Sequence, residues 1–234
     1  MAIKAVLFDL DGTLLPMDQD EFTRAYFKLL AAKLAPRGYD PGALVDGIWA
    51  GTAAMVKNDG RCKNEDAFWA RFAQIFGERV YDDKPLLDEY YRNEFQNVKA
   101  VCGCNPMAAD TVKRCRASGL RVALATNPIF PAIATLSRMR WAGLDEADFE
   151  LCTTYENIGY CKPNLDYYRE ILRRLDCRAE DCLMVGNDVD EDMVAAELGM
   201  EVFLITDCML NRRNKEVSQY NRGGFSELQR FLNI

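Results

Sequence analysis

The sequence contains no histidine among its 234 residues. This absence excludes Ser-His-Asp and Cys-His catalytic arrangements and every metal site that depends on imidazole ligands. It also removes the one side chain that ordinarily titrates near neutral pH. Any enzymatic chemistry must therefore use carboxylates, lysines, tyrosines or cysteines, with or without a metal ion.

Long apolar runs and an excess of positive charge are missing as well. No uninterrupted apolar stretch approaches the roughly 18 residues of a membrane span, and Asp9 and Asp11 interrupt the apolar N-terminal run, so we expect no signal peptide. The 29 basic and 36 acidic residues give a net charge of −7. This charge argues against a nucleic acid or an anionic membrane as partner, because both require a positive face.

The nine cysteines contain no C-x-x-C pair, and their number is odd. Cys102 and Cys104 form a lone C-x-C, which supplies too few ligands for a zinc site. Such scattered cysteines are typical of free thiols in a reducing compartment. We therefore expect a cytoplasmic protein, and the sequence leaves monomer and homodimer equally open.

Hydropathy patterns divide the chain into two kinds of structure. Residues 3–10 form a short apolar run that predicts a strand buried on both faces, whereas residues 18–98 show only helical patterns. After residue 100, apolar strand-like runs alternate with helical segments, which predicts a parallel sheet covered on both faces. The expected fold is a doubly wound α/β core, residues 1–16 and 100–234, with an all-helical domain, residues 17–99, inserted after the first strand.

Capping residues and apolar runs predict the individual elements. The expected helices of the insert begin at Asp18, Asp40-Pro41, Asn64 and Pro85. In the second part of the chain we expect helices at 106–118, 131–140, 165–175, 191–198 and near 225–231, and strands at 120–126, 149–154, 182–186 and 200–205.

Polar residues gather where four expected strands end. In open parallel sheets, ligands bind at the carboxyl ends of the strands. The residues concerned are Asp9, Asp11, Gly12 and Thr13 after the first strand, then Thr126 and Asn127, then Lys162, and finally Gly186, Asn187, Asp188 and Asp192. Together they offer the groups that a phosphate and a divalent cation need.

Each of these features also has an ordinary structural explanation when taken alone. Thr126-Asn127 could cap a helix, Lys162 could be solvated, and the acids at 188–192 could complement a helix dipole. Residues 9 and 11, however, point the same way from an extended segment, and two adjacent carboxylates need a cation or a shared proton. A phosphate and cation site at one edge of the sheet explains all four features together.

Four segments resemble, in order and spacing, the motifs of the haloacid dehalogenase superfamily of phosphohydrolases. These are FDLDGTLL at 8–15, Thr126-Asn127, Lys162-Pro163 and GNDVDED at 186–192. The helical insert is similar to the cap of the phosphoglycolate phosphatase and β-phosphoglucomutase branch. The resemblance implies a Rossmann-like core, an Mg²⁺ cofactor and a small phosphorylated metabolite as substrate.

The resemblance also implies a role for each matching residue. Asp9 would attack phosphorus and form an aspartyl phosphate, and Asp11 would protonate the leaving group and then activate water. Thr126 and the backbone N–H of Asn127 would bind phosphoryl oxygens. Lys162 would neutralise phosphoryl charge and keep Asp9 ionised.

The implied Mg²⁺ ligands are the Asp9 carboxylate, the Asp11 backbone carbonyl and one side-chain oxygen at 187–188. The fourth motif of the family usually has an aspartate directly after its first glycine, and here Asn187 stands at that position. We expect Asp188 to be the third ligand, with Asn187 as the alternative. The expected supporting residues are Gly12, Thr13 and Asp192, the last of which would orient the catalytic lysine or a metal-bound water.

Other functions within and beyond the superfamily remain as alternatives. Dehalogenases lack the second acid of the first motif, so Asp11 argues against one. A phosphonate hydrolase would need a Schiff-base lysine in the cap, and nothing singles out Lys57 or Lys63. A sugar-phosphate mutase and a non-catalytic relative that binds a phosphometabolite stay open, the latter because of Asn187.

Overall fold

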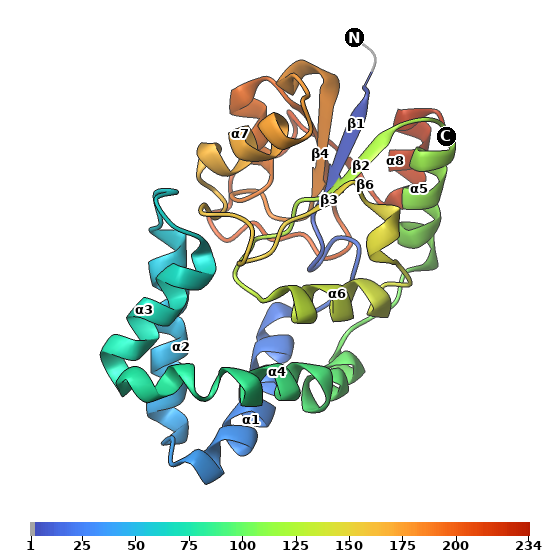
Figure 1. Cartoon of the computed structure of the whole chain (residues 1–234). Coiled ribbons are helices and arrows are strands. Elements are labelled where there is room, and N and C mark those ends of the chain that lie inside the picture. The colour runs from blue at the N-terminus through green and yellow to red at the C-terminus, as the bar shows by residue number, and fades with distance from the viewer. Residues whose placement is uncertain (1–2) are drawn as a thin grey trace.

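The computed structural model describes residues 3–234 and contains a six-stranded parallel sheet (Figure 1). The strands lie in the order β3-β2-β1-β4-β5-β6, and every neighbouring pair is parallel. Their bounds are β1 Ala5–Phe8, β2 Arg121–Leu124, β3 Leu151–Cys152, β4 Cys182–Gly186, β5 Glu201–Ile205 and β6 Asn221–Gly223. The expected doubly wound α/β fold is confirmed.

Helices cover both faces of this sheet because the strand side chains alternate between two apolar clusters. Val6 and Phe8 point to the face that packs against α5, α6 and α8, whereas Ala5 and Leu7 point to the face covered by α7. The bounds are α5 Pro106–Ala117, α6 Ala132–Trp141, α7 Leu165–Arg174 and α8 Phe225–Leu232, with short 3-10 turns at η4 Glu146–Asp148 and η5 Ala179–Asp181. Figure 1 shows α7 on one side of β4, and α5 and α8 on the other.

Between β1 and α5 the chain forms only helices. They are α1 Gln19–Leu34, α2 Pro41–Val56, α3 Asn64–Phe76 and α4 Lys84–Arg92, with 3-10 helices η1 Ala35–Arg37, η2 Glu78–Tyr81 and η3 Glu94–Val101. The expected caps are present: the Asp18 carboxylate accepts from the Glu21 amide at 2.8 Å, and the Asp40 carboxylate accepts from the Ala43 amide at 2.9 Å. Among the described residues, no helix has both the length and the apolar character needed to cross a bilayer.

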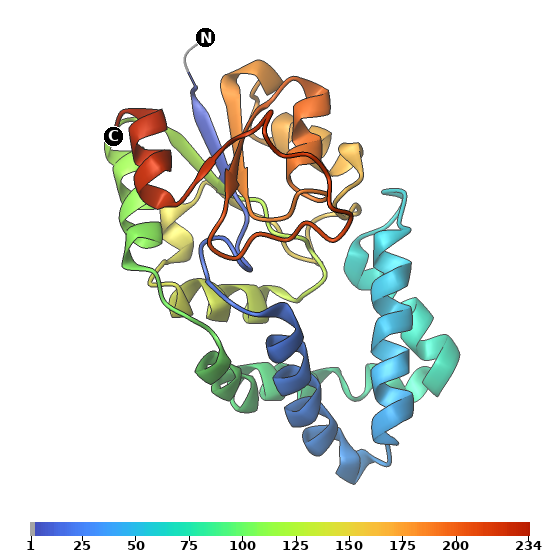
Figure 2. The same ribbon diagram turned by 180° about the vertical axis from the view of Figure 1, so that it is seen from behind.

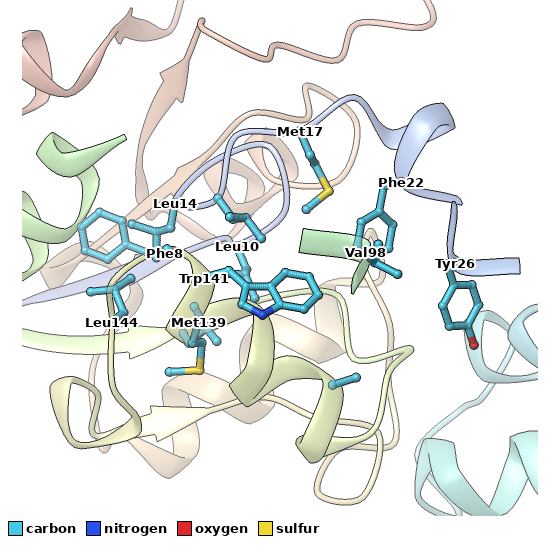
Figure 3. Packing of buried hydrophobic residues seen from close by; sticks show 14 of the residues in the cluster. Phe8, Leu10, Leu14, Met17, Phe22, Tyr26, Val98, Met139, Trp141 and Leu144 are labelled. Atoms are coloured by element: carbon cyan, nitrogen blue, oxygen red, sulfur yellow. The ribbon is translucent and has the colours of Figure 1, made fainter. Parts of the chain in front are cut away.

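Two adjacent segments connect the insert to the sheet, one entering it and one leaving it. Met17 forms an antiparallel bridge with Cys102, and the Gly103 amide donates to the Pro16 carbonyl at 2.7 Å. Apolar side chains continue from the sheet through this connection to the insert, as Figure 3 shows from Phe8 and Leu10 to Phe22 and Tyr26. The insert therefore lies beside the edge at which the strands end (Figures 1 and 2).

Three expectations about elements need correction. The segment 191–198 is not an α-helix but contains the 3-10 helix η6 Met193–Leu198, which follows a turn in which the Asp188 carboxylate accepts from the amides of residues 190 and 191. The strand expected at 149–154 is reduced to the two residues of β3. Strand β6 was not expected, because its sequence Asn-Arg-Gly has no apolar residue and pairs only at the edge of the sheet.

Candidate phosphate and metal site

The loop after β1 brings Asp9 to the edge of the sheet. Asp9 is only 8% exposed, and the Thr13 hydroxyl donates to its Oδ2 at 3.0 Å. Between them, Gly12 has a φ of +85°, and a Cβ at this position would lie 2.3 Å from Nδ2 of Asn187. Glycine is thus required both by the turn and by the close approach of the loop after β4.

Lys162 forms a buried ion pair with two carboxylates. Its Nζ lies 2.9 Å from Oδ1 of Asp9 and 2.6 Å from Oδ1 of Asp192, and Lys162 is only 1% exposed. Burial alone would lower the pKa of the ammonium, but Asp192 and Asp9 outweigh it and raise the pKa well above its ordinary value. Asp9 is consequently held beside a permanent positive charge.

Asp192 is fixed by the backbone around it. The Asp188 amide donates to its Oδ2 at 3.0 Å. A Cβ on Gly186 would lie 2.1 Å from the same oxygen, so only glycine leaves room for the carboxylate beneath the end of β4. Gly186 and Asp192 therefore act together to set the position of the Lys162 ammonium.

Asn187 and Asp188 make different contacts. Oδ1 of Asn187 accepts from the Thr13 hydroxyl at 3.1 Å, and its Nδ2 donates to the Cys208 carbonyl at 2.7 Å. Asp188 instead binds the amides of residues 190 and 191 through Oδ1, at 2.8 and 2.9 Å, while Oδ2 lies 3.5 Å from Arg212 Nη1. The Asn187 oxygen thus shares a hydroxyl with Asp9, whereas the Asp188 carboxylate belongs to a local turn.

Thr126 and Asn127 follow β2, at the same edge. Thr126 is 2% exposed, and its carbonyl accepts from the hydroxyls of Thr153 and Tyr167 at 2.7 and 2.8 Å. The Asn127 amide group donates to Oε2 of Glu191 at 3.0 Å, and its Oδ1 is buried without a hydrogen-bond partner among residues 3–234. Hydrogen bonds thus fix the backbone at Thr126, while Oδ1 of Asn127 has no donor within residues 3–234.

Asp11 forms an ion pair with Arg138 of helix α6 through its Oδ2. Its other oxygen, Oδ1, is buried and has no partner in the described part of the chain. Burial raises the pKa of Asp11 above its ordinary value, although the Arg138 charge opposes the shift. The two aspartates of the first motif therefore occupy different electrostatic environments.

A cavity of about 700 Å³ separates the helical insert from this edge of the sheet. Its walls on the insert side are mainly apolar, and the polar residues Asp11, Asn127, Glu191 and Arg212 line it on the side of the sheet. Asp9 and Lys162 lie outside this lining, deeper in the core. The arrangement gives a substrate room for an organic group above a polar floor.

A buried contact joins the insert to the core. Asn64, at the start of α3, is fully buried, and its side-chain amide donates to the carbonyls of Pro128 and Tyr160, both at 3.2 Å. These two carbonyls flank the segments that carry Asn127 and Lys162. The insert thus contacts both of these segments directly.

Sequence reasoning missed Arg138, Glu191 and Arg212. Arg138 left one signal, since it is a charged residue on a helix face otherwise formed by buried residues such as Ala134 and Met139. Glu191 stood among the acids at 188–192 without being singled out. Arg212 belongs to the cluster Arg212-Arg213-Lys215, which the sequence favours as a solvated tail over a phosphate site. Its contact with Gln19, at 2.9 Å, joins residues 193 positions apart.

The donor atoms fit Mg²⁺ better than a softer metal. Among residues 3–234, no three His, Cys, Asp or Glu side chains gather in a metal-binding arrangement. The oxygens that do converge are a carboxylate oxygen of Asp9 and the amide oxygen of Asn187, which share the Thr13 hydroxyl. A set of oxygen donors with few charges suits a hard cation that retains several waters.

Replacing Glu191 with glutamine should change how stability depends on pH. Burial raises the pKa of Glu191 to about 7, so between about pH 4.5 and pH 7 the unfolded chain loses this proton while the folded chain keeps it. The wild-type free energy of unfolding should fall over this range relative to Glu191→Gln, by about 1–3 kcal/mol. Urea denaturation of the metal-free proteins at several pH values measures the difference. If the free energy of unfolding had the same pH dependence in the wild type and in Glu191→Gln, the prediction would be wrong. Glu197→Gln, at an exposed position, provides the control.

Comparison with known proteins gives a consistent result. A family model described as haloacid dehalogenase-like hydrolase matches residues 3–199. The chain is 31% identical to the glyceraldehyde 3-phosphate phosphatase of Methanothermobacter thermautotrophicus over 133 residues, or 56% of each protein. It is 26% identical to the ribulose-1,5-bisphosphate 5-phosphatase of Halopiger xanaduensis over 206 residues, 86% of this chain and 83% of that relative. The crystal structure of the HAD-hydrolase YfnB from Bacillus subtilis bound to magnesium has the same fold, with a TM-score of 0.60 and 20% identity over the whole of both chains.

Proposed function

Because this chain belongs to the haloacid dehalogenase-like hydrolase family, we propose that it is an Mg²⁺-dependent phosphatase that forms an aspartyl phosphate on Asp9. Its named relatives are phosphatases of small phosphosugars, and a small phosphorylated metabolite is the proposed substrate. The observation that carries this proposal is the buried ion pair of Lys162 with Asp9 and Asp192. It places an ammonium group directly beside the carboxylate that is proposed to attack phosphorus, in the core below the cavity.

The phosphoryl group would bind at the edge of the sheet where β1 and β2 end. The Thr126 hydroxyl, the Asn127 backbone N–H and the Lys162 ammonium are the proposed donors to its oxygens. Lys162 also places its positive charge 2.9 Å from Oδ1 of Asp9. Asp9 would then attack phosphorus, and the bond from phosphorus to the leaving alkoxide would break.

Asp11 is the proposed acid and base of the reaction. Its position at the floor of the cavity supports proton donation to the leaving alkoxide, and the same carboxylate would then accept a proton from the water that hydrolyses the aspartyl phosphate. Since the sequence has no histidine, no imidazole can share this role. Gly12 and Thr13 support it by shaping the loop that carries both aspartates.

The proposed Mg²⁺ ligands are the Asp9 carboxylate, the Asp11 backbone carbonyl and one oxygen from the loop after β4. When bound, Mg²⁺ would supply positive charge to the phosphoryl oxygens. The contacts favour Asn187 over Asp188 as the third ligand, because the Asn187 oxygen shares the Thr13 hydroxyl with Asp9. The Asp188 oxygens are engaged by backbone amides and Arg212.

Replacing Asn187 with aspartate should strengthen Mg²⁺ binding. The added negative charge lies next to the proposed ion, so the Mg²⁺ concentration for half-maximal activity should fall by about tenfold. Part of the gain is offset, since aspartate cannot donate to the Cys208 carbonyl as Nδ2 does. Mg²⁺ titration of activity measures the change, with Asp188→Asn as the matched control. A large effect of the control and none of Asn187→Asp would favour Asp188 as the ligand.

We further propose that residues 17–99 act as a cap over a catalytic core formed by residues 1–16 and 100–234. The adjacent crossings at Met17 and Cys102 support this division, because two neighbouring connections can bend together. The hydrogen bonds of Asn64 to the core support a closed arrangement that excludes water from the cavity.

The first test is hydrolysis of p-nitrophenyl phosphate and of a panel of phosphosugars, each with and without Mg²⁺. Release of inorganic phosphate that depends on Mg²⁺ is the expected result. Transfer of phosphate between sugar positions without its release would indicate the mutase alternative. The absence of any turnover, together with binding of phosphosugars, would indicate a non-catalytic relative.

A further inference from the structure

The buried ion pair between Arg138 and Asp11 is not explained by folding alone. Arg138 is fully buried, and Asp11 is its ion-pair partner among residues 3–234. Burying a guanidinium is costly unless its charge is compensated, and an apolar residue of similar size often stabilises a core at least as well. A charged residue at this position therefore calls for a role in the site that Asp11 faces.

Arg138 is held rigidly on helix α6. Its Nη2 donates to the Thr135 hydroxyl at 3.3 Å, and its Nε lies 3.4 Å from the Ala134 carbonyl. The guanidinium carbon also lies 4.3 Å from the ring centroid of Phe130, a favourable distance for a cation and an aromatic face. Only Nη1 reaches Asp11, so the guanidinium presents one fixed donor to one carboxylate oxygen.

The two oxygens of Asp11 are consequently different. Oδ2 is bound by Arg138, whereas Oδ1 has no partner within the described residues. Asp11 lines the cavity and Arg138 does not, so Arg138 can act on a substrate only through Asp11. The geometry fixes one oxygen of Asp11 against Arg138 and leaves the other, Oδ1, buried without a partner among the described residues.

We propose that Arg138 is a positioning residue that anchors Oδ2 of Asp11 and thereby holds in place the carboxyl group that protonates the leaving group. This inference rests on the proposed function. As the Asp9–phosphorus bond forms and the bond from phosphorus to the alkoxide oxygen breaks, the proton of the Asp11 carboxyl group passes to that oxygen. The carboxylate left on Asp11 then has its counter-ion already in place.

The dependence on the leaving group distinguishes this role from a structural one. An alkoxide needs a proton as it leaves, whereas nitrophenolate leaves without one. The ratio kcat/KM reports the steps up to transfer of the phosphoryl group, and it can be compared for glyceraldehyde 3-phosphate and p-nitrophenyl phosphate in the presence of Mg²⁺. A variant that merely loosens the fold should lose activity on both substrates in parallel.

Arg138→Met should lower kcat/KM for glyceraldehyde 3-phosphate by about 10- to 100-fold and for p-nitrophenyl phosphate by less than about threefold. Arg138→Lys, which keeps the charge, should recover part of the loss. Once Asp11→Asn has removed the acid, Arg138→Met should have little additional effect, because both changes interrupt the same interaction. The matched control is Arg140→Met, an exposed arginine on the same helix that donates to Ser137 at 3.0 Å.

Thr135→Val keeps the test decisive if Arg138→Met does not fold. It removes one partner of the guanidinium at nearly constant volume and should give a smaller loss, again selective for the alkyl phosphate. Parallel losses on both substrates, or additive effects of Asp11→Asn and Arg138→Met, would overturn the proposal. A wild type inactive on p-nitrophenyl phosphate and on the whole panel of phosphosugars would instead contradict the proposed function and this inference with it.

Discussion

The Asp9→Asn protein should fold normally and lose at least about 10³-fold in kcat on every phosphate ester that the wild type hydrolyses. An amide is not a nucleophile toward phosphorus, and it carries no charge to pair with Lys162. An asparagine oxygen can still accept the hydrogen bond that the Thr13 hydroxyl donates to Asp9 at 3.0 Å, so the loop should keep its shape. The measurements are steady-state phosphate release and the circular dichroism spectrum of the variant.

Asp18→Asn provides the control for this substitution. Asp18 lies nine residues further along the chain, but its side chain only accepts a hydrogen bond from the Glu21 amide at the start of α1. Asparagine caps a helix as well as aspartate does, so this variant should keep full activity. If Asp9→Asn kept more than about a tenth of the wild-type rate, the aspartyl phosphate mechanism would be wrong.

Much of the fold follows from local signals. Asp18 and Asp40 cap helices where the sequence places them, because a cap depends only on residues three positions away. Strand β4 coincides with its apolar run, residues 182–186. The exception is η6, because hydropathy patterns predict a helix there but do not distinguish a 3-10 helix from an α-helix.

The site could be predicted only in part, because several of its contacts join distant residues. The four strand ends follow from topology, but the ion pair of Asp11 with Arg138 joins residues 127 positions apart and depends on how α6 packs. The choice between Asn187 and Asp188 is similarly invisible in the sequence. In the structure the Asp188 carboxylate accepts from the amide of residue 190, whereas the Asn187 oxygen accepts from the Thr13 hydroxyl. The sequence alone does not show which of the two side chains makes which contact.

Lys162→Met should be the most destabilising single substitution in the site. It leaves the carboxylates of Asp9 and Asp192 buried next to each other without the ammonium that lies 2.9 and 2.6 Å from them. Removing one partner of a buried ion pair costs about 3–5 kcal/mol. Urea denaturation near neutral pH should show this decrease in the free energy of unfolding, together with loss of phosphatase activity.

The loss in Lys162→Met should shrink as the pH falls. Without the ammonium, each buried carboxylate binds a proton more tightly in the folded chain than in the unfolded chain, so stability decreases as pH rises through the carboxylate range. Lys162→Met, Asp192→Asn should recover part of the stability but no activity, since one buried charge is gone and Asp9 still lacks its counter-ion. Lys4→Met is the matched control, because Lys4 also pairs with an aspartate, Asp181 at 3.1 Å, but is 62% exposed. Lys4→Met should lower the free energy of unfolding by less than about 1 kcal/mol at any pH. An equal loss in both lysine variants would show that burial does not determine how much the Lys162 ion pair contributes to stability.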